Sequence, residues 1–213
     1  MKVYEDGSLR LFWVGPLGPF ANNAYVVADA EAGEAIIVDM PSGSEEVLGV
    51  MGGLRVKGIL ITHTHHDHWL GYDVVKGATG APVYCHPAEP FLPRERVDIF
   101  LEDGQEIGVG GHRIRVLHTP GHTPGSCCFL IGRYLISGDT LFPGGPGRTN
   151  TPQDLQQIIA SITQKLYVLP EDILVLPGHG DPTTIGQSKA EYAVFASRPH
   201  PPDLCGDVLW ESS

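Results

Sequence analysis

The sequence has few basic residues and no cluster of them. Its 213 residues include 14 Lys and Arg against 25 Asp and Glu, which gives a net charge of −11 with neutral histidines. A protein that grips a nucleic-acid backbone needs Lys and Arg gathered on one surface, and no run of that kind occurs here. We therefore expect no nucleic-acid partner.

Long apolar runs and paired cysteine motifs are also lacking. No stretch approaches the roughly 20 apolar residues of a membrane span. The N-terminal sequence MKVYEDGSLR has no apolar segment of the kind found in a secretory signal. The four cysteines form no CxxC pattern, which is typical of a reduced chain. We expect a cytoplasmic protein without a membrane partner.

Short apolar runs that alternate with turns are what the sequence does contain, and they predict one mixed α/β domain over residues 1–213. The predicted strands are 9–15, 23–29, 34–40, 57–63, 81–87 and 172–178, with hairpins over 106–121 and 126–139. The predicted helices are 43–54, 72–80, 151–169 and 187–197. Ser44 and Thr151 are the expected N-caps of the first and third helices. The Pro-rich tail, about 198–213, is expected on the surface.

Metal-binding side chains follow four of these strands, each time at a strand–turn junction. The densest group is ITHTHHDHWLG (61–71), and the others are VLHTPGHTPG, LISGDT and LVLPGHG. A single histidine at a strand end is usually structural, and a turn aspartate usually caps backbone. The H-x-H-x-D-H spacing and its three companions instead favour a metal site built from His63, His65, Asp67, His68, His122, Asp139 and His179.

Seven ligands are too many for one zinc ion, which takes three or four from the protein. They suit two divalent metals that share a carboxylate, with zinc the first expectation and iron or manganese the alternatives, since no ligand is a thiolate. The remaining histidines are expected to lie on the surface or in structural hydrogen bonds: His66, His86, His112, His118 and His200.

Together these motifs resemble the metallo-β-lactamase superfamily. The resemblance runs through HTHHDH (63–68), TPGHTPGS (119–126), SGDTLFPGG (137–145) and PGHGDPTTIG (177–186), and with the early strands it covers nearly the whole chain. It implies a four-layer αββα sandwich with the metal site at one edge of the two sheets. It also implies that one metal is held by His63, His65 and His122, the other by Asp67, His68 and His179, and that Asp139 bridges them.

Within the superfamily the sequence looks most like glyoxalase II (hydroxyacylglutathione hydrolase). The loop GDTLFPGGPGRT is similar to the one that follows the bridging aspartate in such enzymes, and Arg148 falls where they carry a basic residue facing the substrate. The loop departs from the usual Gly-Cys-Gly, and only 34 residues follow His179, so we expect no helical glutathione-binding domain. Phe142 and Trp69 flank the ligands and are candidates for contact with an acyl group.

The resemblance implies hydrolysis of a thioester or related activated acyl bond of a small molecule, with a metal-bridging hydroxide as nucleophile. Asp139 would position that hydroxide as the bridge, and Asp67 would orient it. Three alternatives remain: a persulfide dioxygenase with one iron on His63, His122 and Asp139, a lactonase, and a non-catalytic metal-binding protein. Members of the superfamily often dimerise, so a homodimer is consistent with the sequence.

Overall fold

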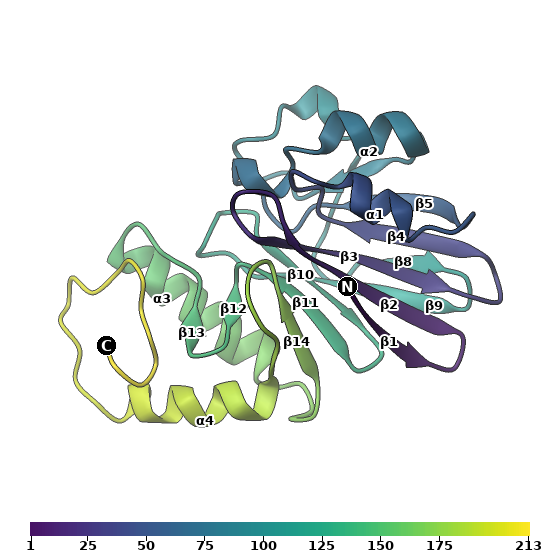
Figure 1. The fold of residues 1–213 in the computed structure, drawn as a ribbon. Helices are drawn as coiled ribbons and strands as arrows, with labels where there is room; N and C mark the ends of the chain where they lie inside the picture. The colour runs from purple at the N-terminus through teal and green to yellow at the C-terminus, as the bar shows by residue number, and fades with distance from the viewer.

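Two β-sheets face each other in the computed structural model, which describes residues 1–213 (Figure 1). The first sheet contains seven strands in chain order: β1 (Lys2–Asp6), β2 (Leu9–Leu17), β3 (Asn22–Asp29), β4 (Glu34–Val38), β5 (Arg55–Leu60), β6 (Val83–Cys85) and β7 (Ile99–Phe100). The second runs in the order β15–β14–β11–β10–β9–β8: β15 (Thr183–Thr184), β14 (Leu174–Pro177), β11 (Tyr134–Gly138), β10 (Cys127–Ile131), β9 (His112–His118) and β8 (Glu106–Val109). A small ribbon pairs β12 (Leu141–Phe142) with β13 (Gly145–Pro146).

Helices cover the outer faces of both sheets (Figure 1). Buried side chains of α1 (Glu45–Gly49) and α2 (Tyr72–Thr79) pack on the first sheet. Those of α3 (Pro152–Ser161) and α4 (Ile185–Ala196) pack on the second. A third apolar cluster lies between the sheets. The predicted αββα sandwich is therefore confirmed, and none of its helices combines the length and apolarity needed to cross a bilayer.

The central strand β4 shows why its sequence reads as an unbroken apolar run. Ile36 and Val38 belong to the cluster between the sheets, whereas Ala35 and Ile37 face α1 and α2. Because both faces are covered, all four residues are buried, and alternation with polar residues is not needed.

The third predicted helix begins as its sequence indicates. Thr151 accepts a hydrogen bond from the backbone N–H of Asp154, and the Asp154 carboxylate accepts one from the Thr151 N–H, which forms a capping box. Pro152 occupies the first turn, where its missing N–H costs nothing. The helix continues beyond α3 as a single π-helical turn, η3 (Ile162–Leu166).

The first predicted helix is shorter than expected and spans only α1. Ser44 occupies its N-cap position as predicted, but the Ser44 hydroxyl donates to the carbonyl of Pro41 instead of accepting from the helix N-terminus. Sequence reasoning also missed β1, β7, β15 and the β12–β13 ribbon, because strands of two residues carry no measurable periodicity and β1 is a solvent-exposed edge.

The expectation that the whole C-terminal tail lies on the surface is wrong. Val208 and Trp210 are almost completely buried, and Trp210 packs among Tyr192 and Phe195 of α4. In Figure 1 this last segment, drawn in yellow, returns from α4 toward α3 and β13. Proline favours turns but does not prevent the residues between turns from packing.

Trp210→Ala should destabilise the protein by about 3–5 kcal/mol, because the substitution leaves a cavity the size of an indole ring under α4. Urea unfolding would measure the change. Leu209→Ala is the matched control: that side chain is 53% exposed, and its removal should change stability by no more than about 0.5 kcal/mol. Equal effects of the two substitutions would contradict a structural role for Trp210.

Candidate metal centre

Four loops bring the seven predicted ligands together at one edge of the two sheets. His63, His65, Asp67 and His68 follow β5 and run into a short 3-10 turn, η1 (His66–His68). The other three side chains follow strands of the second sheet: His122 follows β9, Asp139 follows β11 and His179 follows β14. Strands hold their end residues rigidly while the loops beyond stay open, so both sheets contribute fixed donors to one place.

Three histidines form the first group of donors. His65 Nδ1 lies 3.1 Å from His63 Nε2 and 2.8 Å from His122 Nε2. Donors around a tetrahedral zinc ion with Zn–N of about 2.0–2.1 Å are separated by about 3.3 Å. The three nitrogens are therefore spaced so that one cation can meet all of them.

The second group contains one carboxylate and two imidazoles. Asp67 Oδ2 lies 3.2 Å from His179 Nε2 and 3.5 Å from His68 Nε2, and the two ring nitrogens are 3.3 Å apart. These separations again match the edges of a coordination shell. The group lies beside the first one and forms a second place for a cation.

Asp139 faces both groups. Its Oδ2 lies 3.7 Å from His122 Nε2 on one side and 3.6 Å from His179 Nε2 on the other, and its Oδ1 lies 3.5 Å from His68 Nε2. Oδ1 is buried without a hydrogen-bond partner, which is costly for a carboxylate oxygen unless a cation satisfies it. The cluster therefore fits a site for two divalent metals, and its nitrogen and oxygen donors suit zinc, iron and manganese alike.

Hydrogen bonds to the outer ring nitrogens orient three of the histidines. Nδ1 of His68 pairs with the Asp39 carboxylate at 2.9 Å. Nδ1 of His122 donates to the Arg148 carbonyl at 2.8 Å, and Nδ1 of His179 donates to the Phe20 carbonyl at 3.0 Å. A ring that donates through Nδ1 presents the lone pair of Nε2, so these bonds select the tautomer that can bind a metal.

Burial and neighbouring charges set the ionisation of the donors. Burial lowers the pKa of His63 well below its ordinary value, which favours the neutral, metal-binding form. Burial alone raises the pKa of Asp139, but the adjacent His68 and the other imidazoles outweigh it and hold that pKa below its ordinary range. A neutral imidazole and an ionised carboxylate are the forms that ligate metals.

Sequence reasoning missed Asp39, which supports the site from behind. It follows β4, is 2% exposed, and has a positive φ of 62° that Asp tolerates better than most residues. Its carboxylate accepts hydrogen bonds from the backbone N–H and the hydroxyl of Thr62, at 2.8 and 2.7 Å, and holds His68. The signal was present in IIVD, an acidic residue directly after an apolar strand, as at the ligand positions.

Glu89 was also missed, and it ties two ligand loops together. Its Oε2 accepts from the N–H and the hydroxyl of Thr64, both at 2.6 Å, beside His63 and His65. Its Oε1 accepts from the Thr123 hydroxyl and from the Gly125 N–H, in the loop that carries His122. No local pattern announces this role, because the two loops are brought together only by the fold.

The His179 loop is held by the opposite sheet. Tyr25 of β3 donates its hydroxyl to the Pro177 carbonyl at 2.6 Å, and Asn23 donates its amide to the carbonyls of Pro177 and Gly180. The same loop also requires glycine at position 178, because a Cβ there would lie 2.3 Å from Asp139 Oδ1.

Comparison with known proteins agrees with this geometry. Residues 17–179 match the sequence model of the metallo-beta-lactamase superfamily. The chain belongs to this superfamily.

Several metallo-beta-lactamase superfamily relatives are similar over most of their length. The hydroxyacylglutathione hydrolase GloC of Haemophilus influenzae is 34% identical over 82% of this chain and 92% of that protein. The structure of the BLEG-1 B3 metallo-beta-lactamase aligns with a TM-score of 0.75 and 32% identity, over 84% of this chain and 96% of that one. That of TTHA1623 in a di-iron-bound form aligns with a TM-score of 0.69 and 33% identity, over the same fractions of the two chains.

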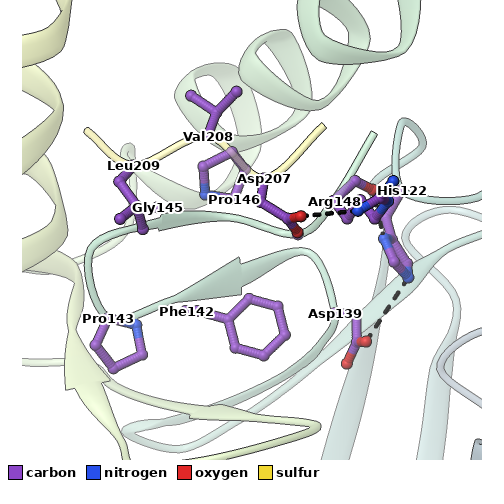
Figure 2. Close-up of a pocket in the computed structure, with 11 residues that line it drawn as sticks. His122, Asp139, Phe142, Pro143, Gly145, Pro146, Arg148, Asp207, Val208 and Leu209 are labelled. Carbon is purple, nitrogen blue, oxygen red and sulfur yellow. Dashed lines mark hydrogen bonds and ion pairs between the residues drawn. The ribbon is translucent and has the colours of Figure 1, made fainter. Parts of the chain in front are cut away.

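The three predicted substrate residues of this superfamily member lie in different surroundings. Phe142 and Arg148 line a cavity of about 290 Å³ that opens onto His122 and Asp139 (Figure 2). Trp69 does not line it: its ring packs against the core beneath α1 and α2, and Nε1 donates to the Thr64 carbonyl at 3.1 Å. Trp69 therefore supports the ligand loop from outside the cavity.

The remaining histidines lie outside the metal cluster, as predicted. His66 is exposed. His112 pairs with the Ser8 hydroxyl, and His200 and His118 with backbone carbonyls. His86 stacks on His118 with ring centroids 3.9 Å apart, and burial together with that neighbour lowers the pKa of His86 to about 4.

Asp39→Ala should weaken metal binding about 10- to 100-fold, because His68 loses the group that fixes its ring and its tautomer. Competition with a chromophoric chelator would give the dissociation constants. Asp73→Ala is the control, since Asp73 is an exposed aspartate of α2 whose only side-chain partner is Arg96. Unchanged affinity in Asp39→Ala would show that His68 needs no support.

Gly178→Ala should lower the number of metals bound per chain, because the added methyl group would overlap Asp139 and the His68 ring. Elemental analysis of the purified variant gives that number. Gly77→Ala in α2 has open space around the new methyl group, and should keep its metals with stability unchanged or raised by about 0.5–1 kcal/mol. Full metal content in Gly178→Ala would contradict this account of the loop.

Proposed function

We propose that this protein is a metal-dependent hydrolase of thioesters and related activated acyl bonds that works with two divalent cations, most simply zinc. The observation that carries the proposal is Asp139, a carboxylate with a buried, unpartnered Oδ1 that faces two separate groups of donors at once. Two metals held by these donors would supply a hydroxide nucleophile at neutral pH and would polarise the substrate carbonyl.

The chain itself positions the reacting groups. Asn22 donates to Asp67 Oδ2 at 2.8 Å, and His179 Nε2 lies 3.2 Å from the same oxygen, so the Asp67 carboxylate has one orientation. A fixed carboxylate beside the donors accepts a hydrogen bond from the attacking water and aims its lone pair. Positioning of this kind lowers the entropic part of the barrier.

The shortage of proton donors in the cavity favours a good leaving group. The acidic residues lining it are Asp139, which faces the donors, and Asp207, which is paired with Arg148. A thiol with a pKa of about 8.5 departs as thiolate without a general acid, whereas an amine does not. The similarity to a hydroxyacylglutathione hydrolase supports the same substrate class.

The donors beyond His63, His122 and Asp139 favour this proposal over an iron-dependent persulfide dioxygenase. One iron on those three residues would leave Asp67, His68 and His179 converging without a cation. A lactonase would use the same metals and differ only in the acyl substrate, so substrate tests separate it. A non-catalytic metal-binding protein would use the same donors, and a metal-loaded protein without turnover would identify it.

The wild-type protein should contain close to two metal ions per chain and should hydrolyse small thioesters, with activity lost on chelation and regained on reloading. Metal content comes from elemental analysis, and released thiol from a chromogenic disulfide. One iron per chain with persulfide-dependent oxygen uptake would establish the dioxygenase instead. Hydrolysis of lactones alone would establish the lactonase.

Asp67→Asn should lower kcat about 10²- to 10⁴-fold if its carboxylate orients the attacking water. Asp139→Ala should lose metal as well as turnover, because both donor groups lose their common oxygen ligand. Initial rates and metal content, measured on the same preparations, separate the two effects. Asp73→Asn is the control, and wild-type rates in either site variant would exclude this mechanism.

A further inference from the structure

The C-terminal tail forms one wall of the cavity beside the metal centre. Asp207, Val208 and Leu209 line it together with Phe142 and Pro146 (Figure 2). The segment is held at both of its ends. Gly206 and Thr149 exchange two backbone hydrogen bonds, at 3.1 and 2.9 Å, and the Trp210 N–H donates to the Gly144 carbonyl at 2.8 Å.

The tail lies directly on the loop that follows Asp139. A Cβ at Gly145 would lie 2.5 Å from the Val208 carbonyl oxygen, so no larger residue fits beneath the tail. Within the tail, the side chains of Val208 and Trp210 are buried. The tail is therefore packed in place and forms a fixed wall of the cavity.

The antiparallel Thr149–Gly206 bridge places Arg148 and Asp207 opposite each other as the next pair in register. Arg148 Nη1 lies 2.8 Å from Asp207 Oδ2 (Figure 2). Both side chains are mostly exposed, at 65% and 75% of their surface, so the pair adds little to stability. The aligned backbones nevertheless place the two charges side by side.

This pairing changes what the cavity can bind. Arg148 is the only Lys or Arg that lines the cavity, and Asp207 neutralises it. Much of the remaining lining is apolar: Phe142, Pro143, Pro146, Val208 and Leu209. A substrate carboxylate that approaches Arg148 also approaches the negative charge of Asp207, which is paired with the same guanidinium. Two exposed like charges about 4 Å apart repel by roughly 1 kcal/mol, which corresponds to roughly a fivefold loss of affinity.

We propose that Asp207 determines specificity: it masks Arg148, so that the cavity prefers thioesters with an uncharged thiol carrier over thioesters whose carrier bears a carboxylate. The inference rests on the proposed thioesterase function. Asp207 sets the preference between thiol carriers, and the chemistry takes place at the metal centre.

Asp207→Asn tests the proposal with two acetyl thioesters, one of N-acetylcysteamine and one of 3-mercaptopropionate, which differ in carrier charge. The ratio of their kcat/KM values should shift about fivefold toward the anionic substrate. Arg148→Gln should shift it by a similar factor in the opposite direction, and the double variant should return near the wild-type ratio. Asp203→Asn, in the same tail but outside the cavity, is the matched control and should leave the ratio unchanged.

Binding of non-hydrolysable propyl thioethers of the same two carriers, measured by calorimetry, provides a readout independent of turnover. A shift of the affinity ratio in Asp207→Asn without hydrolysis of any thioester would uphold this inference and overturn the proposed function. Hydrolysis with an unchanged ratio would overturn the inference alone. An equal shift in Asp203→Asn, or no detectable binding of either thioether together with no turnover, would also overturn it.

Discussion

Ring nitrogens and carboxylate oxygens that all present lone pairs to one another repel unless a cation lies between them, and this edge of the molecule is arranged around that constraint. His65 Nδ1 lies 2.8 Å from His122 Nε2, and the buried Oδ1 of Asp139 has no hydrogen-bond partner. Such a cluster persists only if the surrounding structure holds it. Asp39 and Glu89 provide that support, one behind a ligand ring and the other between two ligand loops.

The same constraint connects the two sheets. The donors after β5 come from the first sheet, and His122, Asp139 and His179 come from the second. Tyr25 and Asn23 reach across from β3 to the loop that carries His179. Metal binding and packing of the sheets are therefore parts of one equilibrium, in which a bound cation stabilises the folded arrangement by mass action.

The sequence was sufficient for the fold class and for bringing the seven donors to one place, because the donors lie in the loops that follow β5, β9, β11 and β14, and these strand ends meet at one edge of the two sheets. It was insufficient for Asp39 and Glu89, whose partners come from other loops. Trp210 was misjudged because prolines predict turns and say nothing of what packs beneath them. The facing positions of Arg148 and Asp207 depend on a single bridge between residues 57 positions apart, which no local pattern encodes.

The cavity takes its lining from two segments that lie far apart in the sequence, residues 142–148 and residues 207–209. The second segment supplies no metal donor, so a change at the exposed Asp207 side chain alters the lining while all seven donors stay as they are. Recognition of a substrate and the chemistry done on it are thus carried by separate stretches of the chain, and one can be re-engineered without rebuilding the other.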